Sequence, residues 1–469
     1  MGHSDCAESL WGHALGFLRS VQYKIIAVLA FFAIITSFIF TSTSRVEADE
    51  LEWPEAPELV SGAAILMDAD TGAILYEKNA YERNYPASTT KILTGLLVAQ
   101  NNALSDVVTF SSEAANSVSL EDATLASKTG EQFTVEQALY GLLLHSANEM
   151  AYALAEHTSG SLSAFVDKMN ETAKNAGALD THFANASGLY DANHYTTAYD
   201  MALIARMCFN NPTFLTIDSA TTYTIPATNK TSQERVFNNR NLLLPGRLYG
   251  YEYCVGGKTG FVGEGGYTYV SYAMKNGMRL ICVCFKSTAD GRFQDAKSLF
   301  EWGFNHFTKI PITGTALISQ FSTISYLSST RFNSKSVVSG FDGSYVTVPK
   351  DTSLGQVAIA EDSKHDVHST DTEVDVPINF MYGDHVVGTA NITFSSAESN
   401  QDESSLLPYA DSSNSSNSSQ PFAVVINVWI VVIALVSVTV IIIFVRRKKM
   451  IDEKSPAKFR RKRHYKKHR

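Results

Sequence analysis

Two short apolar runs, residues 63–68 and 73–76, flank the turn sequence Asp68-Ala69-Asp70-Thr71-Gly72 and predict a β-hairpin. A second hairpin is predicted at residues 266–274 and 278–285, because Asn276-Gly277 between them suits a two-residue turn. Between the hairpins, apolar residues recur with helical spacing instead of alternating. They predict helices at residues 134–144, 149–157, 165–176 and 197–209, and a further helix follows the second hairpin at residues 292–307.

Beyond residue 309 the helical spacing stops. Residues 310–394 are rich in Gly, Asp, Thr and Val without a 3.6-residue period, which predicts a separate small β domain. Residues 395–421 are dominated by Ser, Asn, Asp and Glu, so they cannot bury enough apolar surface to fold, and a disordered stalk is expected. A chain of 469 residues with 45% hydrophobic content has room for these regions and for a larger domain at residues 49–309.

Both ends of the chain carry an apolar segment. Residues 1–48 contain an apolar run that follows Lys24 and ends before Val46-Glu47-Ala48, which predicts an export signal cut near residue 49, with an uncleaved anchor as the alternative. Residues 422–445 form an uncharged transmembrane helix long enough to cross a bilayer. The basic segment 446–469 follows, so the positive-inside rule places it in the cytoplasm and residues 49–421 outside.

Charge and cysteine usage narrow the partners. The formal net charge is −9, although residues 446–469 alone hold 13 Lys and Arg, so the rest of the chain is strongly acidic. An acidic body argues against a nucleic-acid partner, and a membrane surface explains the basic tail. The exported part of the chain contains four cysteines, which are expected to be buried thiols: Cys208, Cys254, Cys282 and Cys284. No metal-ligand spacing occurs, so neither a metal nor a cofactor is expected.

The first candidate for chemistry is Ser88, three residues before Lys91 at the start of an apolar helix. This spacing places both side chains on one face of the helix, near its positive end. A neutral lysine can take the proton of a serine hydroxyl, so the pair is a candidate nucleophile that needs no histidine. The same spacing in Ser455 and Lys458 of the basic tail shows that the motif also arises by chance.

Two further motifs contain residue types suited to the same chemistry. Ser146-Ala147-Asn148 lies between two predicted helices, where such residues ordinarily form a cap or turn, but a serine can also relay a proton and an asparagine can hold a peptide group. Lys-Thr-Gly occurs at residues 128–130, before a helix, which indicates a surface turn. It occurs again as Lys258-Thr259-Gly260, beside the second hairpin, where the lysine and threonine suit a substrate carboxylate and the chain amides suit an oxyanion.

In this order the three motifs resemble those of the penicillin-recognising serine acyltransferases. The sequences around them, at residues 85–94, 141–149 and 194–202, look like the D-alanyl-D-alanine carboxypeptidase family of low-molecular-mass penicillin-binding proteins. The resemblance covers about residues 55–310. It implies a β-lactamase/transpeptidase-like catalytic domain of the α+β class, in a single-pass bacterial cell-membrane protein whose catalytic domain faces outward.

The resemblance also implies the reaction. Ser88 would attack the carbonyl between the two terminal D-alanines of a peptidoglycan stem peptide, with Lys91 as the base. Ser146 would help protonate the leaving amine with Lys258 nearby, and water would then release the shortened peptide. Penicillin and other β-lactams would acylate Ser88 and so inhibit the enzyme.

The remaining implied roles concern binding. Asn148 would hold the peptide, and Thr259 would bind the terminal carboxylate. The backbone amides of Ser88 and Phe261 would bind the oxyanion. Gly260, between Thr259 and Phe261, completes the set of binding residues. Two positions depart from the family pattern, because Ala147 and Glu149 stand where glycine and aspartate are usual. Residues 185–189 resemble the Asn-Pro-x-Gly-Leu turn of the family without its proline.

Other functions remain open at this point. A class A β-lactamase shares all three motifs but needs a glutamate that drives deacylation, and the only similar stretch surrounds Glu171, on what reads as a solvated helix face. A transpeptidase or an endopeptidase would use the same acyl-enzyme with another acceptor or scissile bond. A membrane-tethered wall-binding protein without turnover is the non-enzymatic alternative.

Overall fold

The computed structural model describes residues 51–119, 121–312, 337–339, 343–362, 368–370 and 373–395. The predicted export signal, the transmembrane helix at residues 422–445 and the basic tail lie outside these residues, as does the stalk apart from residue 395. Among the helices of the described residues, none combines the length and the apolar character needed to cross a bilayer.

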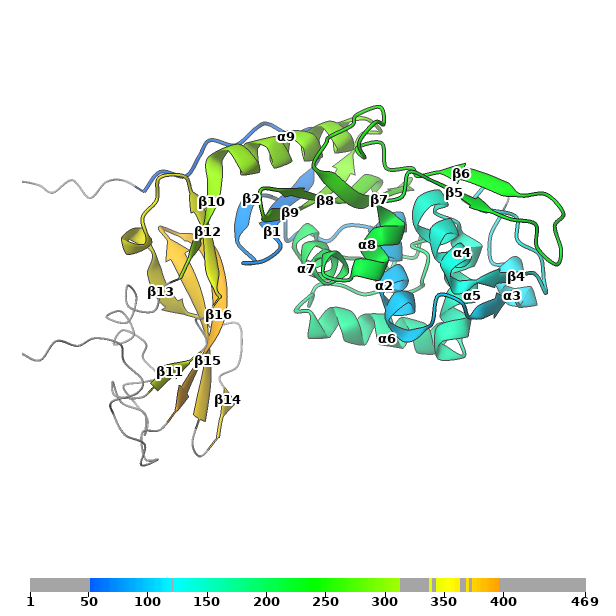
Figure 1. Cartoon of the computed structure of the whole chain (residues 1–469), viewed down its shortest axis with the longest axis horizontal. Helices are drawn as coiled ribbons and strands as arrows, with labels where there is room; N and C mark the ends of the chain where they lie inside the picture. The colour runs from blue at the N-terminus through cyan, green and yellow to red at the C-terminus, as the bar shows by residue number, and fades with distance from the viewer. Residues whose placement is uncertain are drawn as a thin grey trace, which may run out of the picture. The chain divides into compact units, whose positions relative to one another are not determined.

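A five-stranded antiparallel sheet forms the centre of the region that ends with residue 306 (Figure 1). Its strand order is β2-β1-β9-β8-β7, so the first hairpin pairs with the second through β1 and β9. Both predicted hairpins are confirmed, and β7 at one edge carries the second Lys-Thr-Gly motif. The strands are β1 (Ala63–Asp68), β2 (Ile74–Lys78), β7 (Cys254–Val262), β8 (Gly266–Lys275) and β9 (Met278–Ser287).

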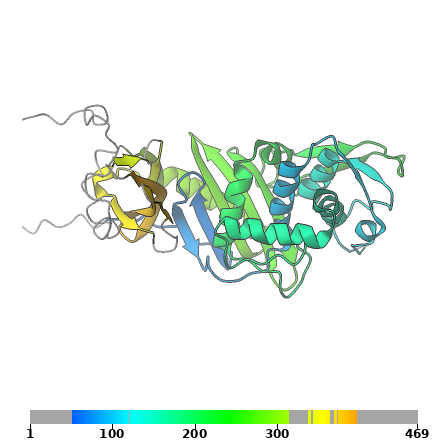
Figure 2. The same cartoon turned by 90° about the horizontal axis from the view of Figure 1, so that it is seen from below.

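Helices cover both faces of this sheet. In Figure 1, α9 (Gly291–His306) lies along one face, while α7 (Ala198–Phe209) and α8 (Pro212–Asp218) lie on the other with α2 (Lys91–Asn101). Figure 2 shows the same layers turned by 90°, with the blue strands β1 and β2 beside the green strands β7 to β9. The further helices are α3 (Ser112–Ala115), α4 (Val135–Tyr140), α5 (Asn148–Ser159) and α6 (Leu162–Asn175).

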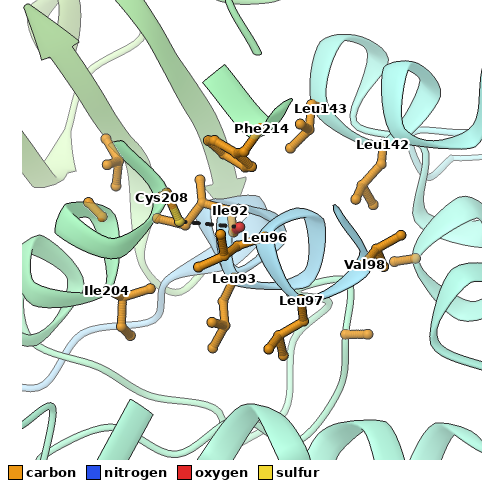
Figure 3. Close-up of a cluster of buried hydrophobic side chains, with 14 of the residues drawn as sticks. Ile92, Leu93, Leu96, Leu97, Val98, Leu142, Leu143, Ile204, Cys208 and Phe214 are labelled. Carbon is orange, nitrogen blue, oxygen red and sulfur yellow. Dashed lines mark hydrogen bonds between the residues drawn. The ribbon is translucent and has the colours of Figure 1, made fainter. Parts of the chain in front are cut away.

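Alternation along the central strands explains the two cores. Side chains at every second position of β1, such as Ile65, belong to the core on the side of α7, which also includes residues of α2 and α5, whereas the intervening ones, such as Leu66, belong to the core on the side of α9. The helix α2 lies inside the first core and is apolar nearly all round, as a central helix must be. Figure 3 shows its Ile92, Leu93, Leu96, Leu97 and Val98 surrounded by side chains of neighbouring elements.

Local sequence explains where several helices begin. Thr134 accepts a hydrogen bond from the backbone of Gln137, whose side chain accepts one from the Thr134 N–H, so a capping box starts α4 as predicted. Thr197 caps α7 in a similar way through the N–H of Asp200. Two short hairpins complete this region, β3 (Val107–Thr109) with β4 (Gln132–Thr134) and β5 (Thr222–Ile225) with β6 (Arg235–Asn238).

The described residues after α9 form strands and one short 3₁₀ turn, Leu354–Gln356. A sheet of order β11-β16-β15-β13, with β14 on β15, buries residues such as Val374 and Phe380, and β10 pairs with β12. The strands are β10 (Phe307–Pro311), β11 (Val337–Ser339), β12 (Tyr345–Pro349), β13 (Ala358–Glu361), β14 (His368–Ser369), β15 (Glu373–Tyr382) and β16 (His385–Ser395). The domain limits at residues 310 and 394 stay predictions.

Candidate active site

Ser88 lies in a 3₁₀ turn, Ala87–Thr90, that leads directly into α2. Ala87 before it has a φ of 51°, a left-handed conformation that is unusual for alanine and is often found at functional sites. Two glycines allow other chain segments to approach this turn. A Cβ on Gly188 would lie 1.9 Å from the Ala87 carbonyl oxygen, and one on Gly260 would lie 2.9 Å from the Ser88 nitrogen.

Lys91, in the first turn of α2, is fully buried and its ammonium nitrogen reaches three groups. Nζ lies 3.0 Å from Ser88 Oγ and 2.6 Å from Asn148 Oδ1, and it also contacts the carbonyl oxygen of Ser187. Burial lowers the pKa of Lys91 well below its ordinary value, and the nearby Lys258 charge lowers it further. Burial therefore favours the neutral form of Lys91 more than it is favoured in an exposed lysine.

The hydrogen-bond acceptors around Lys91 determine which bonds a neutral amine can make there. It carries two N–H donors and one lone pair, and the carbonyl oxygens of Asn148 and Ser187 can only accept. When a neutral amine donates to these two oxygens, its lone pair is left for the side of Ser88, whose Oγ lies 3.0 Å from Nζ. In this arrangement a neutral Lys91 is within hydrogen-bond reach of the Ser88 hydroxyl, which is the distance that a general base requires.

Ser146 lies beside a second lysine. It follows a π-helical turn, Gly141–His145, and has a φ of 67°, which ends that turn and lets α5 begin at Asn148. Lys258 on β7 donates to Ser146 Oγ at 3.0 Å and to the carbonyl oxygen of Thr259 at 2.7 Å. Burial lowers the pKa of Lys258 to about 7, with the Arg240 charge as the next cause.

The rest of the second Lys-Thr-Gly motif lines the edge strand. Thr259 is nearly buried, whereas Phe261 is 59% exposed and its ring lies 4.6 Å from that of Tyr267. The first motif behaves differently, because Lys128 and Thr129 are exposed in a turn before β4. The prediction of a surface turn at residues 128–130 is therefore confirmed.

Two arginines near this strand were missed by sequence analysis. Arg240 has an exposed side chain, yet its charge lowers the pKa of both Lys91 and Lys258. Arg292, in the first turn of α9, donates to the carbonyl oxygen of Gly260 at 3.2 Å. Both arginines lie outside the Lys258-Thr259-Gly260 motif and belong to other segments of the chain. The sequence therefore offers no reason to connect them with this strand.

A third missed group is a backbone carbonyl. Ser187 presents its oxygen to Lys91 from the turn at residues 185–189, where the usual proline is absent. Asn185 closes this turn instead, because its Oδ1 accepts from the N–H of Gly188 at 2.7 Å and from that of Ser187 at 3.1 Å. A carbonyl has no sequence signature, so only the fold reveals it.

Several other predictions concern residues outside this site. The four described cysteines are free and buried, as expected, and the Sγ atoms of Cys282 and Cys284 lie 3.7 Å apart. Glu171 is exposed on α6, which confirms its assignment to a solvated helix face. Within the part of the chain that the structure describes, no three His, Cys, Asp or Glu residues form a group that could hold a metal ion.

A serine beside a buried lysine, at the start of a helix next to an antiparallel sheet edge, defines the class of serine acyltransferases that use lysine in place of histidine. Residues 51–289, about half of the chain, match the family model described as D-alanyl-D-alanine carboxypeptidase. The chain belongs to this family, so the resemblance drawn from its motifs is confirmed.

Individual relatives agree with this assignment. The chain is 34% identical over 256 residues to D-alanyl-D-alanine carboxypeptidase DacF of Bacillus subtilis, covering 53% of this chain and 64% of DacF. It is 31% identical over 286 residues to DacD of Escherichia coli K12, covering 59% of this chain and 71% of DacD. The solved Streptomyces K15 DD-transpeptidase is 32% identical, with a TM-score of 0.50 and coverage of 54% of this chain and all of that one. The fold is therefore transpeptidase-like.

Proposed function

We propose that this protein is a serine-type D-alanyl-D-alanine carboxypeptidase that removes the terminal D-alanine from peptidoglycan stem pentapeptides. The observation that carries the proposal is the pairing of Ser88 with the buried Lys91, together with a second pair, Ser146 and Lys258, whose lysine charge acts on Lys91. The names of DacF and DacD support the same substrate. All eight residues expected from the motifs belong to this proposed site: Ser88, Lys91, Ser146, Asn148, Lys258, Thr259, Gly260 and Phe261.

Acylation begins at the nucleophile. The Ser88 proton passes to the lone pair of Lys91 as Oγ bonds to the carbonyl carbon of the scissile D-alanyl-D-alanine bond. The backbone N–H groups of Ser88 and Phe261 stabilise the oxyanion that develops. When the C–N bond breaks, Ser146 gives its proton to the leaving amine and is resupplied by Lys258, which donates to its Oγ.

The free carboxylate of the substrate selects the end of the peptide. Thr259 supplies a hydroxyl beside Lys258, and the positive charges of Arg240 and Arg292 lie near the same strand. A carboxylate attracted by these groups places the last peptide bond next to Ser88. A β-lactam also combines an amide with a carboxylate, so it would acylate Ser88 and inhibit the enzyme.

Deacylation by water completes a carboxypeptidase cycle, whereas an amine acceptor would complete a transpeptidase cycle. The exposed position of Glu171 removes the only stretch that suggested the deacylating glutamate of a class A β-lactamase. In the membrane topology that we propose, residues 422–445 span the bilayer and the basic tail is cytoplasmic. The export signal at residues 1–48 then places the catalytic domain outside, next to its peptidoglycan substrate.

The test uses the purified full-length chain in detergent, with Ser88→Ala as the matched variant. D-alanine release from a stem pentapeptide and labelling by a fluorescent penicillin are measured for both proteins. The proposal expects release and labelling by the native chain and neither by Ser88→Ala. Labelling without release would indicate transpeptidase or endopeptidase action or a wall-binding receptor, and the absence of both signals in the native chain would refute an acyl-enzyme.

A further inference from the structure

A buried carboxylate lies behind the strand that carries Lys258. Asp218 is the last residue of α8 and its side chain is fully buried. Its Oδ2 accepts a hydrogen bond from the backbone N–H of Gly257 at 2.6 Å, but its Oδ1 has no hydrogen-bond partner among the described residues. Burying a carboxylate with so few partners is costly, so a protein retains one where the charge has a use.

The chain around Gly257 is shaped to admit this carboxylate. The pairing of β7 with β8 shifts register between Cys254 and Gly256, just before Lys258. A Cβ on Gly256 would lie 2.6 Å from Asp218 Oδ2, and Gly257 has a φ of 150° with space for no side chain, since a Cβ would lie 2.6 Å from the Val270 oxygen. Two glycines therefore allow the carboxylate to reach the residue that precedes Lys258.

Asp218 faces one charged group, Lys258, and several neutral ones. Burial raises the pKa of Asp218 to about 6, while the Gly257 hydrogen bond and the Lys258 charge oppose that rise. In the other direction, the Asp218 charge raises the pKa of Lys258 against the effects of burial and Arg240. The remaining groups facing Asp218 have pKa values raised by burial and stay neutral near pH 7; they are Cys208 on α7, Cys254 on β7, and Tyr269 and Tyr272 on β8.

We propose that Asp218 is a positioning residue for acyl transfer, which fixes the strand before Lys258 through Gly257 and keeps the Lys258 ammonium protonated for Ser146. The inference rests on the role proposed above for Lys258. Its effect reaches the substrate only through that lysine, because Asp218 is buried behind the strand. The effect of Asp218 also depends on pH, because the carboxylate becomes protonated and loses its charge below about pH 6.

The test compares native protein and Asp218→Asn as full-length chains between pH 5 and pH 9. The second-order rate of labelling by a fluorescent penicillin and the rate of D-alanine release are measured at each pH. Removing the negative charge lowers the pKa of Lys258, so the basic limb of both profiles moves to lower pH. We expect a loss of about three- to tenfold at pH 8 that disappears near pH 5, where native Asp218 is itself neutral.

Asp295→Asn is the matched control. Asp295 is also a buried acid that accepts backbone hydrogen bonds, from Ser61 at 2.7 Å and Val60 at 3.1 Å, but it is not among the charges that act on Lys258. Its variant is expected to lose thermal stability without a displaced basic limb. If Asp218→Asn does not fold, Asp218→Ala, which leaves room for water at Gly257, takes its place.

The outcomes separate the two proposals. Native protein that neither labels nor releases D-alanine refutes the function and with it this inference. Native activity together with an Asp218→Asn profile that runs parallel to the native one at every pH refutes the positioning role alone. A displaced basic limb, with retained activity at pH 5, supports it.

Discussion

The site contains two buried lysines, each with its Nζ 3.0 Å from a serine hydroxyl, and their surroundings differ. Lys91 donates to Asn148 and Ser187, which are neutral carbonyl groups, and the charge with the largest effect on its pKa, Lys258, disfavours its ammonium form. Lys258 has the carboxylate of Asp218 behind its strand. Burial lowers the pKa of both lysines, well below the ordinary value for Lys91 and to about 7 for Lys258, where the Asp218 charge opposes the fall.

In the proposed reaction the two serine–lysine pairs act at opposite ends of the scissile bond. A neutral lysine accepts the proton of an attacking serine, and a protonated lysine returns a proton through the other serine to the leaving group. The assignment comes from the environment of each lysine, because the side chains are chemically identical. The predictions below alter one lysine environment at a time.

The largest effect is expected for Lys91→Met. Methionine has a similar length but no lone pair of comparable basicity, so Ser88 loses its base and acylation by penicillin falls by on the order of 10³-fold. The carbonyl oxygens of Asn148 and Ser187 also lose a donor, which lowers the free energy of unfolding by about 1–3 kcal/mol for each unsatisfied group. Labelling rates and denaturant unfolding measure the two effects separately. A labelling rate within tenfold of the native one would contradict the base role.

A smaller effect is expected for Lys258→Met, about 10²-fold in D-alanine release, because Ser88 and its base remain in place. Lys128→Met is the matched control, since it removes a lysine from the same three-residue motif in an exposed turn. Its release rate should equal that of the native chain. Equal losses in both variants would mean that the effect comes from the change in net charge and not from the position of Lys258 in the proposed site.

The contrast between the two Lys-Thr-Gly motifs also shows what sequence can predict. Asn276-Gly277 and the apolar runs on either side of it identified the second hairpin, beside which residues 258–260 lie. Gly130 with Thr134 identified the other copy as a turn before a helix. These signals are local. They succeed because turn and cap chemistry depends on residues that are close in sequence.

Other parts of the site depend on contacts between distant residues. Arg240 and Asp218 reach Lys258 from outside its motif, and Ser187 contributes only a carbonyl oxygen. The π-helical turn before Ser146 has the same apolar spacing as the α-helix that precedes it, so the sequence predicted one helix at residues 134–144. Tertiary packing decides each of these features, and a single sequence carries no signal for it.

The last prediction reverses part of the difference between the lysines. Asn148→Asp places a carboxylate 2.6 Å from Lys91 Nζ with almost no change in shape. The negative charge favours the ammonium form and raises the pKa of Lys91, so less of the base is neutral at pH 7. The acidic limb of the pH profile for penicillin labelling should move to higher pH, with a loss of about tenfold at pH 7 that shrinks as pH rises.

Asn148→Ala separates this charge effect from the loss of the amide, because it removes the amide without adding charge. Its labelling rate should fall at every pH while the acidic limb remains near its native position. An Asn148→Asp limb that coincides with that of Asn148→Ala would show that Lys91 is not titrating in this range. The assignment of base and acid to the two lysines would then have to rest on their distances to the reacting atoms and not on the pKa of Lys91.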